Sequence, residues 1–597
     1  MHTYSLHKRI SLAALCAMLI LPFLTPHHFN PIPTFYQEWT AAACGILAAT
    51  LLLRQKLLEQ LEIPRIAMLP LGILGLLLIQ FVFGLVAFRT QALIFALYLL
   101  WAVLILTLGR SLRQRISLEK LVNWFAKAIL CGSLLASLLL ALQLVDPRIG
   151  LGWVFPSAKG GGNLGQANHL ANYLWLGIAS AIYLHTQEKI GVMLFAFFTL
   201  VLLSAASLTG SRSVILYAAG FSALSLWAAW HFRQTPLKRI AKITFLLLPT
   251  TVLLQLIFSY FDLANLLHTS LSGERFFSTV SGASQRLQLW RTGLYIFCEH
   301  PWLGAGIGQF PVNSYLVVGT QPDGTFLGGG EHAHNLLIHL LSEFGLIAPI
   351  LVVFFGYRWW LGFVRQEWTA AHWWIASLLL VLATHSQLEY PLWYTFFLGI
   401  AALLLGIGSN AGIRPRITSS GRLLVILILL LGSLTLATMA FDYRKLERTL
   451  NWQVNSEGEK LSWKQTHETL SALHRESLFS NYVDLSYAYQ LSVDRESLKD
   501  KITVTEMAIR FSPVDLITFK LAYLLALDGQ QGEASVALQR ALATHPDFAP
   551  TALKQLTGLV EHYPELQNLL DEFASYQANR KKITTEVSVR SAPSIQH

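Results

Sequence analysis

Apolar segments long enough to cross a lipid bilayer recur along the first three quarters of this 597-residue chain. A helix crosses the roughly 30 Å of hydrocarbon with about 20 apolar residues, and within lipid it satisfies its own backbone hydrogen bonds. Charged residues make up only 13% of the chain and hydrophobic residues 54%, whereas a soluble domain carries about 25% charged residues. The sequence therefore predicts an all-α polytopic membrane protein and excludes a disordered chain or an ordinary soluble enzyme.

We expect about 12–13 spanning helices, and the count from the apolar runs is thirteen. They cover residues 9–25, 38–53, 66–87, 91–108, 121–145, 169–185, 190–208, 213–232, 243–260, 335–356, 370–386, 391–409 and 422–441. The first segment follows Lys8 and Arg9, as in a signal peptide, but no small-x-small cleavage site follows it, so we expect a retained helix. Four Cys in a chain of this length do not form a disulfide scaffold.

The basic residues predict the orientation. Connections rich in Lys and Arg alternate with short connections nearly free of them, and the basic ones contain Lys8, Arg9, Arg54, Lys56, Arg65, Arg110, Arg113, Arg115, Lys120, Lys189, Arg233, Lys238, Arg239, Lys242, Arg358, Arg365, Arg414, Arg416 and Arg422. By the positive-inside rule the N-terminus is cytoplasmic and the odd-numbered connections face outward. Much of the net charge of +10 is then a topology signal, and no nucleic-acid partner is expected.

Two polar segments interrupt the apolar pattern. We expect a transmembrane domain over residues 1–442 that contains a large outer loop at 261–334, then a soluble α-helical domain at 443–579 and a disordered tail at 580–597. In the second domain the run Ala508–Pro513 recurs, loosely, as Ala541–Pro546, 33 residues later. This offset is close to the period of tetratricopeptide (TPR) units; an irregular helical bundle is the alternative.

Polar residues collect at the outer connections. Gln166, Asn168 and His169 follow a glycine-rich stretch that contains Lys159, and they supply neutral hydrogen-bonding groups at the mouth of an apolar helix. Arg212 is the single charge in a very short outer loop, where its planar guanidinium suits phosphate oxygens. The alternatives are a flexible turn with a snorkelling Lys159 and interfacial snorkelling of Arg212.

The large outer loop contains an amphipathic helix over residues 285–298, with apolar residues spaced to lie in the membrane interface. Arg286 and Arg291 lie beside this apolar stripe. Gly304, Gly306 and Gly308 follow, but no strand precedes them, so a dinucleotide-binding fingerprint is not expected. Contact with lipid headgroups is the alternative role for either arginine.

A run with two histidines lies at the outer mouth of the predicted span 335–356. Glu331, His332, His334 and Asn335 stand within five residues. Residues two apart point away from each other on a helix, and no His-x-x-x-His pair is present, so a metal site is disfavoured. A histidine that titrates near neutrality suits general-base work, while capping of the helix start is the structural alternative.

A fifth polar connection joins the predicted spans 370–386 and 391–409. It places the carboxyl group of Glu389 and the phenol of Tyr390 at the same membrane face. The following Trp393 and Tyr394 are also typical of the aromatic belt at a membrane surface.

In the stretch that contains Arg286, Trp290, His300-Pro301, Gly304-Ala305-Gly306 and then His334-Asn335, the chain resembles the O-antigen ligase/polymerase (Wzy_C) superfamily. Within it, the runs Asn163–His169 and Leu388–Leu392 resemble the bacterial protein O-oligosaccharyltransferases of the PglL type, the pilin-glycosylation ligases of Gram-negative bacteria. The resemblance covers most of the chain, including a helical domain after the last span.

This resemblance implies a GT-C-like enzyme of the bacterial inner membrane that transfers a glycan from undecaprenyl pyrophosphate to a Ser or Thr hydroxyl of a periplasmic protein. It implies an essential His334, transfer roles for Gln166 and Tyr390, pyrophosphate binding by Arg212 and Arg286, and neither metal nor nucleotide. The substrate-binding residues are then expected to be Asn168, His169, Lys159, Arg291, Glu331, His332, Asn335 and Glu389. A direct displacement would invert the anomeric carbon, and no paired-carboxylate motif for a covalent glycosyl intermediate stands out in the sequence.

Other functions stay open on sequence alone. An O-antigen ligase would use the same donor with lipid A–core as acceptor, and a chain-extending polymerase belongs to the same class. A secondary transporter or lipid flippase is the alternative from another class, although transporters usually place ionisable groups near the midplane and show inverted repeats. A membrane-anchored scaffold would not need Arg and His at five outer connections.

Overall fold

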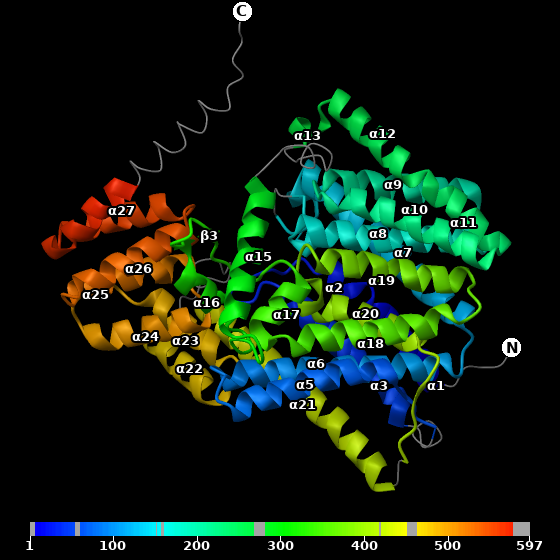
Figure 1. Cartoon of the computed structure of the whole chain (residues 1–597), viewed down its shortest axis with the longest axis horizontal. Helices are drawn as coiled ribbons and strands as arrows, with labels where there is room; N and C mark the ends of the chain where they lie inside the picture. The colour runs from blue at the N-terminus through cyan, green and yellow to red at the C-terminus, as the bar shows by residue number, and fades with distance from the viewer. Residues whose placement is uncertain are drawn as a thin grey trace, which may run out of the picture.

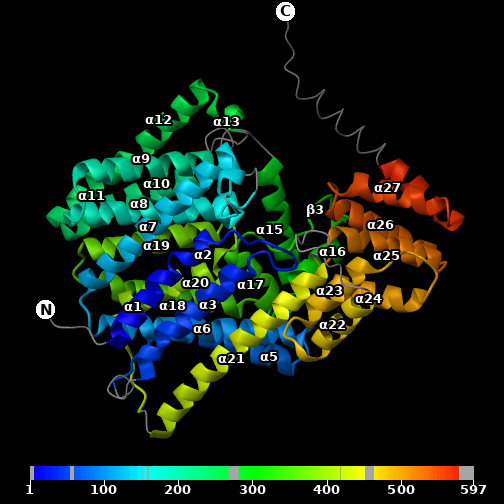
Figure 2. The same ribbon diagram turned by 180° about the vertical axis from the view of Figure 1, so that it is seen from behind.

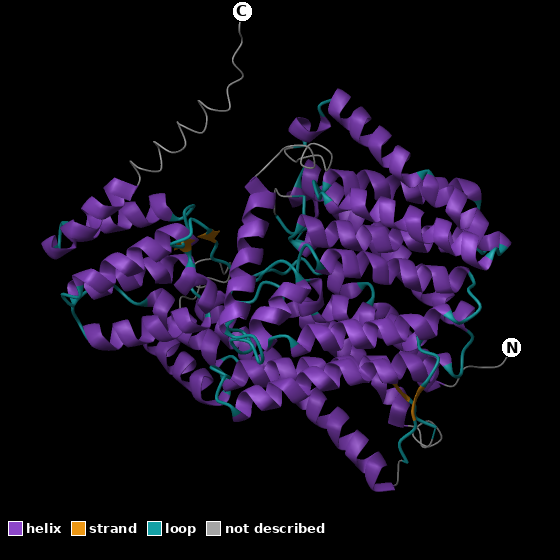
Figure 3. Ribbon diagram, in the orientation of Figure 1, coloured by secondary structure: helices purple, strands orange, loops and turns teal. Residues whose placement is uncertain are grey.

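The structure is a computed structural model that describes residues 6–53, 60–150, 152–156, 160–267, 281–416, 419–450 and 463–576. Its regular elements are almost all helices (Figures 1 and 3). Within these ranges the strands form two short antiparallel pairs, β1 (Ile63–Pro64) with β4 (Gly412–Ile413) and β2 (Gly319–Thr320) with β3 (Phe326–Leu327). Lys159 and the expected tail 580–597 lie outside the described residues.

Eight helical segments in the described part of the chain are long and apolar enough to cross a membrane, by length and composition. They are His7–Leu24, Arg65–Val82, Arg89–Arg113, Leu118–Val145, Ser213–Phe232, Thr235–Tyr260, Ile347–Val364 and Ser420–Thr449. Shorter apolar helices cover Val192–Leu208, Ala370–Ser386 and Thr395–Gly408. The predicted all-α polytopic membrane class is confirmed.

The helices of the apolar part follow one another with short connections. In the first third they are α1 (Leu6–Met18), α2 (Leu21–Leu24), α3 (Phe35–Ala49), α5 (Met68–Val82), α6 (Arg89–Arg113) and α7 (Leu118–Val145). Next come α8 (Ala167–Thr186), α9 (Val192–Leu208), α10 (Ser213–Phe232), α11 (Thr235–Phe245), α12 (Leu247–Tyr260) and α13 (Leu263–Leu266). The third group is α15 (Ser281–Glu299), α16 (Phe310–Val317), α17 (Leu336–Phe344), α18 (Ile347–Val364), α19 (Ala370–Ser386), α20 (Thr395–Gly408) and α21 (Ser419–Leu450).

Helix α8 lies at the centre of the bundle. Nearly all its residues from His169 onward are buried, and it packs against α7, α9, α10 and α19. Two indole N–H groups tie the neighbouring helices together: Trp374 Nε1 donates to Ser180 Oγ on α8, and Trp373 Nε1 donates to Ser225 Oγ on α10. A helix buried on all sides gives the residues at its N-terminal end, Gln166, Asn168 and His169, a rigid base.

The prediction of one continuous span over residues 335–356 is wrong. The chain forms α17 and α18 with a break at Gly345, which has φ +67°, and a Cβ there would overlap the backbone of Trp302. Helix α17, with nine residues, is about 14 Å long and does not cross a bilayer. The apolar residues on both sides, up to Leu341 and from Leu346 onward, favour one span, although Ser342, Glu343 and Gly345 interrupt the run between them.

The C-terminal helices form a separate layer beside the bundle (Figure 1). They are α22 (Trp463–Glu476), α23 (Ser480–Gln490), α24 (Leu498–Phe511), α25 (Asp515–Leu527), α26 (Gln531–Thr544) and α27 (Ala549–Val560), and consecutive helices from α22 to α26 pack on one another. The two copies of the 33-residue repeat end α24 and α26 in equivalent turns. Helix α21 runs through the expected domain boundary at 442 and ends at Leu450 (Figure 2).

Several contacts connect this C-terminal layer to the bundle, and two of them involve aromatic side chains packed into a core. An aromatic cluster joins α3, α21 and the start of α23, with Phe35 stacked on Tyr443 at 3.8 Å between ring centroids and Phe479 against both. On the other side, Tyr315 of α16 packs into the core of the C-terminal helices. The C-terminal layer is therefore held beside the loop that precedes α17.

Candidate active site

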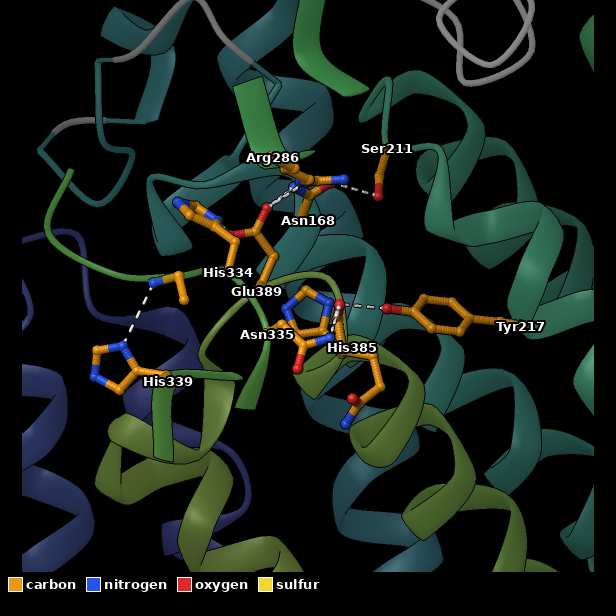
Figure 4. A network of polar contacts seen from close by, with 11 residues as sticks. Asn168, Ser211, Tyr217, Arg286, His334, Asn335, His339, His385 and Glu389 are labelled. Atoms are coloured by element: carbon orange, nitrogen blue, oxygen red, sulfur yellow. Dashed lines mark hydrogen bonds and ion pairs between the residues drawn. The ribbon is translucent and has the colours of Figure 1, made fainter. Parts of the chain in front are cut away.

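Glu389 is the centre of a polar cluster at one end of the bundle (Figure 4). It lies in the turn between α19 and α20, and only 3% of its side chain is exposed. Its Oε1 accepts hydrogen bonds from Asn168 Nδ2 at 2.7 Å and from the Arg286 guanidinium at 2.6 Å, while its Oε2 lies 2.7 Å from His334 Nδ1. Segments more than 200 residues apart in sequence thus converge on one carboxylate.

The electrostatics of the cluster keep Glu389 ionised. Burial by itself raises the pKa of Glu389, but the hydrogen bond with His334 and the charges of His334 and Arg286 outweigh burial and lower this pKa to about 2. A carboxylate accepts hydrogen bonds only, so Nδ1 of His334 must carry a proton. In the neutral imidazole the Nε2 lone pair is then available to accept a proton from another group.

His334 has an unusual backbone conformation. Its φ is +51°, in the left-handed region that costs a non-glycine residue energy and is often found at functional sites. Its side chain is 28% exposed, and Nε2 makes no hydrogen bond with any residue that the structure describes. Asn335 follows as the N-cap of α17, where its side-chain oxygen accepts from the backbone N–H groups of Leu337 and Ile338 at 3.1 Å.

Tyr390 and His332 form the wall beside His334. The Tyr390 ring lies edge-on to His334 with 5.3 Å between centroids, and the His332 ring lies 4.0 Å from it. Burial raises the pKa of Tyr390 to about 12, so its hydroxyl is a hydrogen-bond donor at neutral pH. Burial, with the charges of His339 and His334, holds the pKa of His332 well below its ordinary value. Of the two neighbouring histidines, only His334 contacts Glu389 in the described structure.

The predicted residues at the start of α8 and α10 lie around the same cluster. Ser211 Oγ donates to Asn168 Oδ1 at 2.7 Å, which connects the mouth of α10 to Glu389 through one amide. Arg212, the next residue, is half-buried, and no hydrogen bond joins its guanidinium to the residues described. Gln166 is half-buried at the N-cap of α8, and its side chain likewise has no protein partner within the described ranges.

Three other predicted residues make no hydrogen bond or ion pair with the Glu389 carboxylate in the described structure. His169 is buried within the bundle, edge-on to Tyr394 at 5.0 Å and to His385 at 5.4 Å between ring centroids. Arg291 is exposed on α15 and makes no ion pair in the described part of the chain. Glu331 is exposed and lines a cavity of about 250 Å³ between its loop and the turns after α24 and α26.

His339 and Glu343, which support the loop of His334 from α17, are not among the residues predicted from the sequence. They are spaced i,i+4 in an otherwise apolar helix, and both are almost fully buried. Two ionisable residues at that spacing in an apolar run were the available signal. Tyr217, whose hydroxyl lies 3.0 Å from His385 Nδ1 below Glu389, gave no comparable signal in sequence.

The described residues contain no group of three or more His, Cys, Asp or Glu side chains placed to hold a metal ion. What the cluster offers is a histidine oriented by a buried carboxylate, one guanidinium on that carboxylate and a second, unpaired guanidinium at the adjacent helix start. This arrangement suits proton abstraction from a hydroxyl next to a bound anion.

Comparisons with known proteins agree with this chemistry. The family model described as O-antigen ligase matches residues 195–355, and the model described as the C-terminal part of the virulence factor membrane-bound polymerase matches residues 373–556. Arg212, Arg286 and His334 lie within the first match and Glu389 within the second. The two matches together contain most of the cluster.

Two curated proteins of Acinetobacter baylyi are similar over most of their length. A general O-oligosaccharyltransferase is 28% identical over 416 residues, which cover 67% of this chain and 70% of that protein. A ComP-specific O-oligosaccharyltransferase is 23% identical over 433 residues, which cover 70% of this chain and 74% of that protein. Two regions of the chain thus match models of the O-antigen ligase (Wzy_C) kind, and the chain is similar to O-oligosaccharyltransferases over about two thirds of its length. It is an enzyme of the O-oligosaccharyltransferase kind.

Proposed function

We propose that this enzyme transfers an oligosaccharide from undecaprenyl pyrophosphate to a Ser or Thr hydroxyl of a periplasmic protein such as a pilin. The observation that carries the proposal is the 2.7 Å contact between the buried Glu389 carboxylate and Nδ1 of the partly exposed His334, beside the Arg286 guanidinium. A hydroxyl is a weak nucleophile at neutral pH and needs a base within hydrogen-bonding reach. His334 Nε2 is such a base.

In the proposed reaction the acceptor oxygen attacks the anomeric carbon while the bond from that carbon to the pyrophosphate oxygen breaks. The hydroxyl proton passes to Nε2 of His334, and ionised Glu389 stabilises the resulting imidazolium through Nδ1. The lipid pyrophosphate leaves as an anion. One direct displacement inverts the anomeric carbon, and this stereochemistry follows from a single nucleophile facing the donor.

The leaving pyrophosphate needs positive charge in a site of reduced dielectric. One guanidinium nitrogen of Arg286 bonds Glu389. Its other N–H groups can donate hydrogen bonds to the phosphates of the lipid-linked glycan. Arg212 is half-buried at the first turn of α10, where the helix N-terminus also favours an anion. Gln166 and Tyr390 line the remaining sides and would hydrogen-bond the sugar or the acceptor.

The proposed orientation places this site in the periplasm. Helix α20 begins beside Tyr394, and its C-terminal end lies at Arg110, whose guanidinium donates to the carbonyl oxygen of Ser409. The cluster that contains Arg110 and Arg414 therefore lies at the opposite end of α20 from Glu389. By the positive-inside rule the basic end is cytoplasmic. In this proposal the active site and the C-terminal helices are then on the periplasmic side of the inner membrane.

The test is transfer by purified protein in detergent, with an undecaprenyl-pyrophosphate-linked oligosaccharide and a Ser-containing acceptor peptide. We expect His334→Ala to lower the rate at least about 100-fold, because general-base assistance contributes roughly 10²–10⁴. His300→Ala, an exposed histidine at the end of α15, is the matched control and should transfer normally. Full transfer by folded His334→Ala protein would refute the proposed role, and turnover without a gradient excludes a transporter or flippase.

An O-antigen ligase is the second candidate, because the model of that description matches residues 195–355. It would use the same donor and the same base, with lipid A–core as acceptor. A deletion strain separates the two functions. Loss of protein-linked glycan by mass spectrometry, with an unchanged lipopolysaccharide ladder, supports the protein acceptor, and the reverse pattern supports the ligase.

A further inference from the structure

The loop that carries His334 is anchored by side chains from three helices. Thr292 Oγ1 on α15 donates to the Gly328 carbonyl at 2.9 Å, and Ser314 Oγ on α16 bonds both backbone groups of Gly330. The third anchor comes from α17, where His339 Nδ1 accepts the Ala333 N–H at 3.4 Å. This third contact is the one adjacent to His334, and Figure 4 shows His339 on the far side of the loop from Glu389.

The contact with Ala333 determines the tautomer of the neutral His339 ring. Because Nδ1 accepts a hydrogen bond, the proton must be on Nε2. Nε2 points to Glu343 Oε1 at 3.6 Å, a separation that gives electrostatic orientation rather than a full hydrogen bond. Glu343 Oε1 is itself held by the backbone N–H of Phe310 at 3.2 Å.

Burial of the His339 and Glu343 side chains is unfavourable for folding because both contain polar atoms that lose contact with water. The side chains of His339 and Glu343 are only 5% and 2% exposed, and Glu343 Oε2 has no hydrogen-bond partner among the residues described. The His339 ring is enclosed by Phe310 and Trp393, with centroids 5.1 and 4.8 Å away. An apolar side chain would fill the space without desolvating polar atoms, so packing alone does not account for this pair.

We propose that His339 and Glu343 are positioning residues that hold the backbone before His334 so that His334 keeps its left-handed conformation and its contact with Glu389. A strained conformation persists only where its surroundings impose it. Asn335 fixes the backbone after His334 by capping α17, and His339 fixes the backbone before it. Glu343 acts through His339 by keeping Nδ1 free to accept. The inference rests on the proposed function for the role of His334 alone.

The test compares three variants in the same purified transfer reaction. His339→Phe keeps the ring and removes the acceptor, and we expect kcat to fall about 100-fold with both KM values within about threefold, as misplacement of a base by about 1 Å does. His339→Asn offers an oxygen in place of Nδ1 and should recover about tenfold of that loss. Glu343→Gln should lower kcat by about tenfold, because the orientation of His339 is no longer imposed.

The matched control is His372→Phe. His372 Nδ1 also accepts a backbone N–H, that of Thr369 at 3.2 Å, but at the start of α19, the opposite end of that helix from Glu389. Its kcat should be that of the wild type. Wild-type kcat in folded His339→Phe, or no gain in His339→Asn over His339→Phe, would overturn the proposal. Should His339→Phe fail to fold, wild-type kcat in Glu343→Gln overturns it equally.

Hydrogen exchange at the Ala333 amide gives a readout that is independent of catalysis. The amide should exchange faster in His339→Phe than in the wild type, since its acceptor is gone, and His339→Asn should restore protection. Unchanged exchange in His339→Phe would refute the anchor itself. A His334→Ala protein that still transfers glycan would instead refute the proposed function, while the exchange result still reports on the anchor.

Discussion

At the residue scale, Glu389 contacts side chains from segments that lie far apart in the sequence. A buried carboxylate is destabilising unless it is paired and hydrogen-bonded, and Glu389 receives Asn168, Arg286 and His334 together. The cost of burial is offset only while all three partners are present. Glu389 therefore couples the stability of this end of the bundle to the geometry of the proposed base.

Substitution of Glu389 by Gln should lower transfer about 100-fold or more, because the neutral amide neither stabilises the imidazolium nor selects the tautomer of His334. It should also change the pH dependence of stability. The pKa of Glu389 falls from an ordinary 4.5 to about 2 on folding, so its stabilisation is complete above the ordinary pKa and is lost as the pH falls toward the folded value.

The measurement is Tm in detergent for wild type and Glu389→Gln across the acidic range. The gap between them should be constant near neutrality and narrow between pH 4.5 and pH 2. Glu299→Gln, an exposed carboxyl at the end of α15, is the control and should follow the wild type. A gap that widens on acidification would contradict the ionised state of Glu389.

At the element scale, helix termini build the site. Gln166 and Asn168 stand at the start of α8, Arg212 at the start of α10 and Asn335 at the start of α17. Helix N-termini present free N–H groups and partial positive charge, which suits the pyrophosphate of the proposed donor. The break at Gly345 contributes to the site, because it makes α17 a short helix that places His339 beside the loop of His334.

Removal of the α17 cap by Asn335→Ala should lower the free energy of unfolding by about 1 kcal/mol and also lower kcat, because the residue after His334 is released. Thr369→Ala removes the cap of α19, which lies at the opposite end of α19 from Glu389. It should cost similar stability and leave kcat unchanged. Both are measured by denaturant unfolding and by initial transfer rates. Equal effects of the two variants on kcat would show that general stability, rather than loop geometry, controls the rate.

At the scale of the whole molecule, the C-terminal layer lies directly against the active-site loop. A Cβ at Gly329 would approach Thr544 Cγ2 to 2.7 Å, so the loop and the end of α26 fit together only because residue 329 is glycine. The cavity lined by Glu331, Asp515 and His545 lies at the same junction. The loop that carries His334 is therefore in contact with the C-terminal helices.

Gly329→Val should separate the loop from α26 and lower transfer to a folded protein acceptor about tenfold, because a small displacement of the base is costly. Thr544→Gly removes the side chain in the way, and the double variant should recover most of the loss. The coupling is measured as a double-mutant cycle on kcat/KM. Additive effects of the two substitutions would mean that the loop and α26 do not interact in solution.

Much of this arrangement is predictable from periodicity and chemistry. The apolar runs predict the helices at α6, α7, α8, α9, α10 and α19 to within a few residues, because a lipid-facing or buried helix has to be apolar throughout. The positions of Asn168, Glu389 and His334 at the ends of such runs predict a shared site. The failure at residues 335–356 has a physical cause, since the chain turns at Gly345, where the backbone of Trp302 leaves no room for a Cβ, and this close approach joins segments far apart in the sequence.

The sequence by itself determined that the chain folds in a lipid bilayer, that it is helical, and at which connections between helices the polar side chains lie. These properties depend on composition and on short spacings along the chain. Only the tertiary structure decided which of the two histidines contacts Glu389, that Arg286 pairs with that carboxylate while Arg212 is left unpaired among the described residues, and that His339 supports the loop from behind. Those outcomes depend on packing between helices far apart in sequence. A contact of 2.7 Å is created by the fold, and no local pattern encodes it.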